Sequence, residues 1–264
     1  MGDTTEDMEE KRNIGSLFDR IAGRYDFLNH LLSLNIDRRW RRKAVAQLFK
    51  ASNHPIIQSS NLSCLDVAIG TADLAIEIAK QFTGNPVTSN PITITGIDLS
   101  QEMMRIGEEK VSKLGLQDCI SFLQASALDM PFEDCSFDMV TCAYGVRNFS
   151  DLRQGLGEMR RVLKPEGQLM ILEFSYPKNR FVAWCYDLYF SHILPFVGRM
   201  LSKDKTAYTY LNRSVKNFIW GEEMCQCLRE TGFENPRCIP LTFGITSIYI
   251  SSPNTEKQTT KTYD

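Results

Sequence analysis

The feature that most constrains the fold is an alternation of short apolar segments with helical segments in the middle of the chain. Apolar runs predict five strands, at residues 62–68, 92–98, 120–123, 137–143 and 168–174. Helical spacing separates most of them, for example over 101–114 and 151–163. Strands that alternate with helices of about 10–15 residues form βαβ units with right-handed crossovers. The sequence therefore predicts an α/β protein with a doubly wound, mostly parallel sheet.

Both ends of the chain depart from this alternation. Two helical pieces are predicted at 14–22 and 25–34, separated by Gly23, and a basic helix follows at 38–50. The segment Lys164–Gly167 is predicted to be a turn. After the fifth strand we expect a helical, aromatic-rich cap, a helix at 221–230, and an antiparallel hairpin of strands 233–239 and 243–250. The last two strands bring the sheet to seven.

These segments predict one domain over residues 11–250. Its parts are N-terminal helices (11–50), a ligand-binding core (62–175), a helical cap (176–220) and a final helix with the hairpin (221–250). Polar composition predicts disordered ends at 1–10 and 251–264.

Composition excludes several classes of protein. Apolar residues make up 43% of the 264 residues and charged residues 23%, as in soluble globular proteins. The net charge of −2 gives no basic field for nucleic acid. The eight cysteines form no C-x-x-C pair and the three histidines lack ligand spacing, so we expect reduced thiols and no metal site. An acidic start resembles neither a secretory signal nor a mitochondrial transit peptide, and no uncharged apolar run reaches about 20 residues. We therefore expect a cytoplasmic protein.

The turn after the first predicted strand is a candidate ligand site. Its pattern from Asp66 to Ala72 is D-x-A-x-G-x-A, which differs from the G-x-G-x-x-G of dinucleotide-binding proteins. Small residues let a ligand approach the backbone, and the N-terminus of the following helix favours an anionic group. An ordinary strand-to-helix turn has the same composition, so this pattern alone leaves both interpretations open.

Polar residues also follow the other predicted strands. Asp98 lies 28 residues after Gly70 and could accept hydrogen bonds from ribose hydroxyls. Ser126 and Ala127 could contact a base, and Arg147 with Asn148 could contact a substrate ring. Each has a simpler alternative. Asp98 could only complement a helix dipole, Ser126 could cap a helix, and Arg147 with Asn148 could lie in a surface turn paired with Asp151. Taken together they favour an adenosine ligand without a pyrophosphate, which fits S-adenosylmethionine better than NAD.

Several motifs resemble one enzyme family. They are Tyr25-Asp26-Phe27-Leu28-Asn29, Asp66–Asp73, Tyr144-Gly145-Val146-Arg147-Asn148 and Glu158–Gly167. From about Ile14 to Ile250 the chain resembles the menaquinone/ubiquinone-biosynthesis C-methyltransferases, within the class I S-adenosylmethionine-dependent methyltransferases with their Rossmann-like fold. Asp37, Ser126 and Glu166 depart from the family pattern.

The resemblance implies methylation of a ring carbon of a polyprenylated quinol, with S-adenosylmethionine as methyl donor. Ala72 favours the demethylmenaquinol branch, and the absence of a transit peptide is consistent with a bacterial enzyme. The alternatives are the methoxy-benzoquinol of ubiquinone synthesis or a small-molecule O- or N-methyltransferase. The implied cofactor-binding residues are Asp66, Gly70, Thr71, Asp98, Ser126 and Ala127.

Ring methylation needs an ionised hydroxyl on the acceptor and no covalent enzyme intermediate. Arg147 is the candidate to stabilise the phenolate, and Asn148 and Tyr25 could orient the hydroxyl. A regulatory adenosine-binding module is a rival; loss of Asp98 or Arg147 would favour it, but both residues are present. An NAD-dependent dehydrogenase is another, but a catalytic Tyr-x-x-x-Lys set is absent from the sequence.

An aromatic stripe in the cap has two interpretations. Phe181, Trp184, Leu188 and His192 share one helical face. The stripe could face the core, or it could hold the isoprenoid tail or touch a membrane surface. The basic residues between 38 and 43 could add a contact with anionic headgroups. A peripheral position at the inner face of the membrane and a homodimer are the associations we consider, whereas nucleic acid is not an expected partner.

Overall fold

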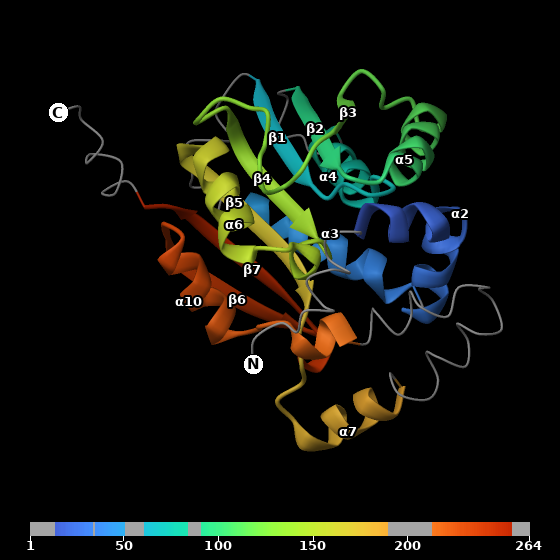
Figure 1. Ribbon diagram of the computed structural model, residues 1–264, viewed down its shortest axis with the longest axis vertical. Coiled ribbons are helices and arrows are strands. Elements are labelled where there is room, and N and C mark those ends of the chain that lie inside the picture. The colour runs from blue at the N-terminus through green and yellow to red at the C-terminus, as the bar shows by residue number, and fades with distance from the viewer. Residues whose placement is uncertain (1–13, 34, 51–60, 84–90, 190–212, 255–264) are drawn as a thin grey trace.

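A seven-stranded sheet forms the centre of the protein in a computed structural model (Figure 1). The structure describes residues 14–33, 35–50, 61–83, 91–189 and 213–254. The strand order is β3-β2-β1-β4-β5-β7-β6, with β7 antiparallel to both of its neighbours and the other pairings parallel. The strands are β1 (Leu62–Val67), β2 (Ile92–Asp98), β3 (Ile120–Gln124), β4 (Phe137–Ala143), β5 (Leu163–Phe174), β6 (Phe233–Leu241) and β7 (Thr246–Pro253). The doubly wound sheet and its terminal hairpin are thus confirmed.

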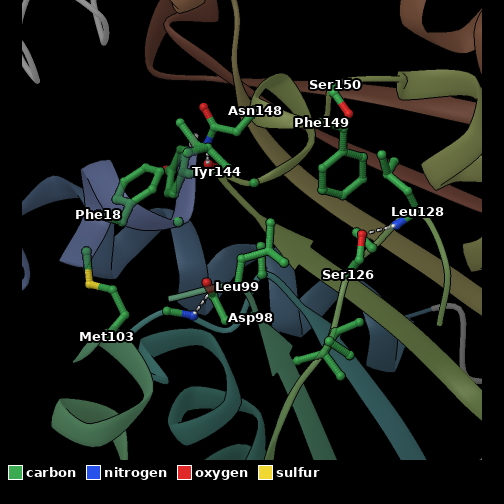
Figure 2. A pocket seen from close by; sticks show the side chains of 18 of the residues that line it. Phe18, Asp98, Leu99, Met103, Ser126, Leu128, Tyr144, Asn148, Phe149 and Ser150 are labelled. Atoms are coloured by element: carbon green, nitrogen blue, oxygen red, sulfur yellow. Dashed lines mark hydrogen bonds between the residues drawn. The ribbon is translucent and has the colours of Figure 1, made fainter. Parts of the chain in front are cut away.

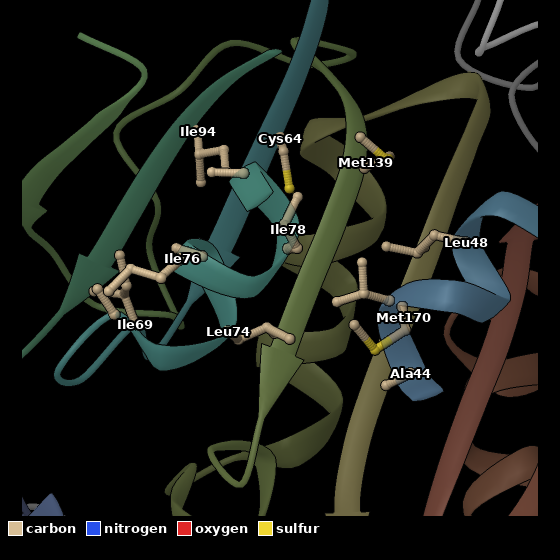
Figure 3. Close-up of a cluster of buried hydrophobic side chains, with 14 of the residues drawn as sticks. Ala44, Leu48, Cys64, Ile69, Leu74, Ile76, Ile78, Ile94, Met139 and Met170 are labelled. Carbon is tan, nitrogen blue, oxygen red and sulfur yellow. The ribbon is translucent and has the colours of Figure 1, made fainter. Parts of the chain in front are cut away.

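Helices cover both faces of this sheet (Figure 1). They are α2 (Ile14–Leu32), α3 (Ile36–Lys50), α4 (Asp73–Thr83), α5 (Gln101–Lys113), α6 (Leu152–Val162), α7 (Arg180–Leu188) and α10 (Glu222–Glu230). One hydrophobic cluster joins the sheet to α3, α4 and α5, and Figure 3 shows part of it around Ile78 and Met170. A second cluster joins the opposite face to α6 and α10.

Local patterns explain these layers. The side chains of β4 are buried from Phe137 to Cys142, as expected of a central strand covered on both faces. In α6 the buried residues fall at i, i+1, i+4 and i+7, which is one helical stripe. They are Gly155, Leu156, Met159 and Val162. The side chain of Asp151 caps this helix by accepting a hydrogen bond from the backbone N–H of Gln154 at 2.9 Å.

The prediction of a helix break at Gly23 is wrong. A single helix, α2, runs from Ile14 to Leu32. Gly23 is exposed, and a Cβ placed there would meet nothing within 4 Å. The cost of a helical glycine, about 1 kcal/mol, is small enough for the packing of α2 against α5 to offset it.

The predicted turn at Lys164–Gly167 is also wrong, because this segment belongs to β5. It forms a bulge between the pairs Phe137–Leu163 and Met139–Gln168. The ammonium of Lys164 bonds the carboxylate of Asp138 at 2.8 Å and so ties the bulge to β4.

The ends of the chain differ from expectation in one place. β7 continues to Pro253, so the predicted tail cannot begin at Ser251. The hydroxyl of Ser251 donates to the Glu234 carbonyl at 2.6 Å, which holds the edge of the hairpin together. Residues 1–10 and most of the predicted cap, 190–212, lie outside the described residues.

Glycine at position 96 is required by close packing. A Cβ on Gly96 would lie 2.0 Å from Cδ1 and 2.8 Å from Cβ of Ile69, at the turn after β1. We expect G96A to lower the free energy of unfolding by about 1–3 kcal/mol, measured by urea denaturation. The control is G157A in α6, where a Cβ meets nothing within 4 Å and a gain of up to about 1 kcal/mol is expected. A G96A protein as stable as wild type would contradict the close packing.

Candidate functional site

A pocket of about 300 Å³ opens where the parallel strands end (Figure 2). Its walls come from the segments that follow β1, β2, β3 and β4, together with the start of α2. They include Gly70, Asp98, the loop 125–128, and Tyr144. The carboxyl edge of a doubly wound sheet is where such folds bind their ligands.

Several residues in the segments around this pocket have a left-handed backbone conformation. Ala68, Gly70 and Ala72 have φ values of 57°, 53° and 65°, and Tyr144 at the end of β4 has a φ of 58°. A left-handed φ costs about 1–2 kcal/mol for a residue that carries a Cβ. Strain of this kind persists where the surrounding structure holds it and is concentrated at functional sites. It shapes the turn after β1 so that the Gly70 N–H points toward β2.

Asp98 connects the ends of two strands. One carboxylate oxygen accepts the Gly70 N–H at 2.8 Å, and the other accepts the Ser100 N–H at 2.9 Å. Burial raises the pKa of Asp98, and the two backbone N–H groups oppose that rise. An ionised carboxylate has about four acceptor positions, so these two bonds leave capacity for hydroxyl groups of a ligand. The residues present therefore fit the ribose of an adenosine group.

Asp66 and Thr71 lie behind this surface and are not among the residues that line the pocket. Asp66 is fully buried and accepts a hydrogen bond from the Thr141 hydroxyl at 2.8 Å. The hydroxyl of Thr71 accepts one from the ammonium of Lys110 at 3.1 Å. Both residues support the turn from the side away from the pocket, whereas Gly70, Asp98, Ser126 and Ala127 line the pocket.

Arg147 belongs to a buried ion pair. Its guanidinium lies 2.8 Å from the carboxylate of Glu173, and the two side chains are 4% and 0% exposed. It also donates to the Tyr144 carbonyl and lies 5.3 Å from the centre of the Phe174 ring. Asn148 lines the pocket and Arg147 lies behind it. The pair places a cation at the end of β4, with a carboxylate that offsets its charge.

Tyr25 can be placed only by its helix. Its backbone belongs to α2, while its side chain lies outside the described residues. The first turns of the same helix line the pocket through Ile14, Gly15 and Phe18, a contribution that the sequence did not predict. These residues have the spacing of a helix face that packs on the core, so the sequence pattern does not distinguish them from core residues. A Cβ on Gly15 would lie only 3.3 Å from the Cβ of Leu99, which explains the small residue.

The apolar part of the wall was also not predicted. Leu99 and Met103, from the β2–α5 segment, and Phe149 line the pocket together with the polar groups (Figure 2). A cavity with an apolar wall and a few convergent polar groups is typical of small-molecule sites. Among the described residues no group of three or more His, Cys, Asp or Glu side chains could hold a metal ion. No described helix is long and apolar enough to span a membrane.

The buried carboxyl of Asp66 predicts a pH-dependent stability. Burial and the nearby charge of Asp98 raise its pKa to about 7, against the opposing hydrogen bond from Thr141. Between pH 4 and 7 the folded state then holds a proton that the unfolded state has lost, so this group lowers stability as pH rises.

We therefore expect the unfolding free energy of D66N, relative to wild type, to increase as pH rises from 4 to 8. Urea denaturation at each pH measures the difference, with D118N as a surface control. A difference that does not change with pH would contradict the raised pKa.

Comparison with known proteins agrees with the fold. A solved S-adenosylmethionine-dependent methyltransferase from Thermotoga maritima, described as a possible histamine N-methyltransferase, superposes with a TM-score of 0.59. The two are 16% identical, and the alignment covers 90% of this chain and 99% of that one, so the likeness concerns the fold alone.

Curated relatives are much more similar in sequence. The demethylmenaquinone methyltransferase of Porphyromonas gingivalis is 42% identical, over 91% of this chain and 93% of the relative. The ubiquinone/menaquinone biosynthesis C-methyltransferase of Geotalea uraniireducens is 43% identical, over 92% of this chain and 97% of the relative. The model of the ubiE/COQ5 methyltransferase family matches residues 5–252, and the chain belongs to this family.

Proposed function

We propose that this protein transfers a methyl group from S-adenosylmethionine to a ring carbon of a reduced, polyprenylated quinone, and that the acceptor is demethylmenaquinol. The observation that carries the proposal is the pocket at the strand ends, which Asp98 lines, in a chain 42% identical to a demethylmenaquinone methyltransferase. The second candidate acceptor is the methoxy-benzoquinol of ubiquinone synthesis, because the Geotalea relative is named for both pathways.

Different lining residues would contact different parts of the cofactor. Asp98 would accept the ribose hydroxyls, and Ser126 with Ala127 would lie beside the adenine. A Cβ on Gly70 would meet nothing within 4 Å, so the backbone there is open to a ligand. When bound, S-adenosylmethionine supplies an electrophilic methyl group attached to a sulfonium. We propose no metal for this chemistry.

The acceptor must be the reduced ring. A quinone is itself electrophilic, whereas an ionised hydroxyl of the quinol raises electron density on the neighbouring ring carbon. That carbon forms the bond to the methyl carbon, the carbon–sulfur bond breaks with its electron pair left on sulfur, and the ring carbon then loses its proton to solvent. The protein has to favour the ionised hydroxyl, align the reacting atoms and exclude water until the methyl group has been transferred.

Arg147 is the cation we propose for the phenolate. The guanidinium remains charged at neutral pH and therefore acts by its field and not as a base. Its carbonyl partner Tyr144 and its chain neighbour Asn148 both line the pocket, which connects the cation to the acceptor side. We propose that Asn148 and Tyr25 orient the hydroxyl.

The acceptor assay tests the proposed function. Purified protein is incubated with methyl-labelled S-adenosylmethionine and either reduced demethylmenaquinone or the methoxy-benzoquinol. We expect label in the naphthoquinol product, and at least tenfold less in the benzoquinol. Parallel binding of S-adenosylhomocysteine is the control for an intact site. Transfer to neither quinol by a protein that binds S-adenosylhomocysteine would refute the acceptor class.

A double variant separates catalysis by Arg147 from its structural role. R147Q leaves the buried Glu173 carboxylate unpaired and is expected to cost about 3–5 kcal/mol of stability. R147Q/E173Q removes both charges, so the unfolding free energy measured in urea should recover by most of that amount. If the cation stabilises the phenolate, kcat of the double variant stays at least about 100-fold below wild type. A double variant that regains both stability and kcat would show that the pair is structural only.

We also propose a peripheral contact of a cytoplasmic protein with the inner face of the membrane, through α7. Phe181 and Trp184 are 71% and 61% exposed, with ring centres 6.2 Å apart, and Leu188 is 44% exposed. Exposed Lys178 and Arg180 precede them in the sequence, a combination that favours an anionic interface. His192, the last residue of the predicted stripe, lies outside the described residues. The homodimer stays a prediction.

Vesicle binding tests this contact. We expect F181S/W184S to sediment several-fold less with vesicles that contain phosphatidylglycerol than wild type does. The matched control is L114S, which removes a 48% exposed apolar side chain at the end of α5. Equal sedimentation of wild type and F181S/W184S would contradict a membrane contact through α7.

A further inference from the structure

The loop that follows β3 is held by one polar stripe of α6. Gln154, Glu158 and Arg161 are spaced i, i+4 and i+7 along this helix and therefore share one side of it. The buried stripe of α6 contains Gly155, Leu156, Met159 and Val162 and packs on the sheet. The polar stripe lies beside it and has no part in the chemistry proposed above.

Side chains of this polar stripe donate hydrogen bonds to the carbonyls of every second loop residue from Leu128 to Phe132. Gln154 Nε2 donates to the Leu128 carbonyl at 2.8 Å. Arg161 donates to the carbonyls of Met130 and Phe132 at 2.9 and 2.6 Å. The loop itself is not an extended strand, because Ser126 and Asp129 form a bridge across a turn and the Phe132 N–H bonds the Met130 carbonyl at 2.8 Å. Side chains of α6 therefore supply hydrogen-bond partners that no neighbouring strand among the described residues provides.

Glu158 accepts a hydrogen bond from a backbone N–H of the same loop. One of its carboxylate oxygens accepts the Met130 N–H at 2.8 Å. Both the N–H and the carbonyl of Met130 are therefore bonded by side chains of α6. Arg161 also bonds both carboxylate oxygens of Glu158, each at 2.7 Å. A bidentate pair orients the guanidinium, which lowers the pKa of Glu158. The two side chains are therefore held in position for the backbone.

Gln154, Glu158 and Arg161 form a clamp on the backbone of residues 128–132. This segment continues directly into the pocket wall. Ser126, Ala127 and Leu128 line the pocket, and Gln154 holds the carbonyl of Leu128 itself. Within the loop, the hydroxyl of Ser126 accepts the Leu128 N–H at 3.1 Å. A wall that is ordered before the ligand arrives reduces the entropy lost on binding.

We infer that Gln154, Glu158 and Arg161 are positioning residues that preset the adenine side of the cofactor pocket. This inference rests on the proposed function for the identity of the ligand. The clamp acts on affinity for the cofactor through the backbone of residues 128–132, and it has no contact with the acceptor. Its loss should therefore change KM for S-adenosylmethionine and leave kcat at saturation within about twofold.

The test compares two neighbouring arginines in the full-length protein. R161A removes the clamp, and R160A removes an arginine that bonds the carbonyls of Gly232 and Asn254 at 3.1 and 3.0 Å instead. We expect R161A to bind S-adenosylhomocysteine about tenfold or more weakly, measured by calorimetry, which corresponds to about 1.4 kcal/mol. In the ligand-free protein the amides of residues 128–132 should exchange with deuterium faster. R160A should match wild type in both measurements.

Conservative variants keep the test decisive if R161A does not fold. Lysine cannot reproduce the bidentate and double-carbonyl bonding of Arg161, so R161K should show the same two changes in smaller degree. E158Q should accelerate exchange at Met130, whose N–H it bonds. A wild-type protein that binds no S-adenosylhomocysteine would overturn the proposed function and this inference with it. Binding by wild type, with equal affinity and equal loop exchange in R161A, R161K and E158Q, would overturn the inference alone.

Discussion

The hydrogen bonds that Asp98 accepts from the backbone of Gly70 and Ser100 are the constraint on which the site depends. They join the strained turn after β1 to the start of α5, and so determine the distance between two walls of the pocket. The hydroxyl of Ser100 bonds the carboxylate of Asp19 at 2.6 Å, which extends the connection to α2, the helix that covers the pocket. The carboxylate of Asp98, together with the Ser100–Asp19 hydrogen bond, thus couples three segments that are far apart in the sequence.

The parts of the site that follow from chain periodicity could be predicted. Alternating strands and helices predict a parallel sheet, and a parallel sheet places the residues after its strands along one edge. Gly70, Asp98, Ser126 and Asn148 each lie at the end of a predicted strand segment or in the few residues that follow it, and all four line the pocket. The hairpin of β6 and β7 was predictable in the same way, because its two apolar runs lie too close together for a crossover.

The parts that depend on tertiary contacts could not be predicted. Gly23 reads as a break, yet packing of α2 on α5 keeps the helix continuous. The segment at 164–167 has every turn signal and still forms a bulge within β5, since Lys164 bonds Asp138 across the sheet. The partner of Arg147 is Glu173, 26 residues away, and nothing in the local sequence of either residue indicates their buried pair. Such pairings are set by the fold and have no periodicity of their own.

We propose that the strand-end pocket brings a methyl donor to a ring carbon of a quinol. The most direct measurement is NMR of the product formed from ¹³C-methyl S-adenosylmethionine and reduced demethylmenaquinone. We expect a ¹³C signal at the chemical shift of an aromatic C-methyl group, whose protons show long-range correlations to ring carbons. A signal at the shift of a methoxy group would place the methyl on oxygen and would contradict C-methylation.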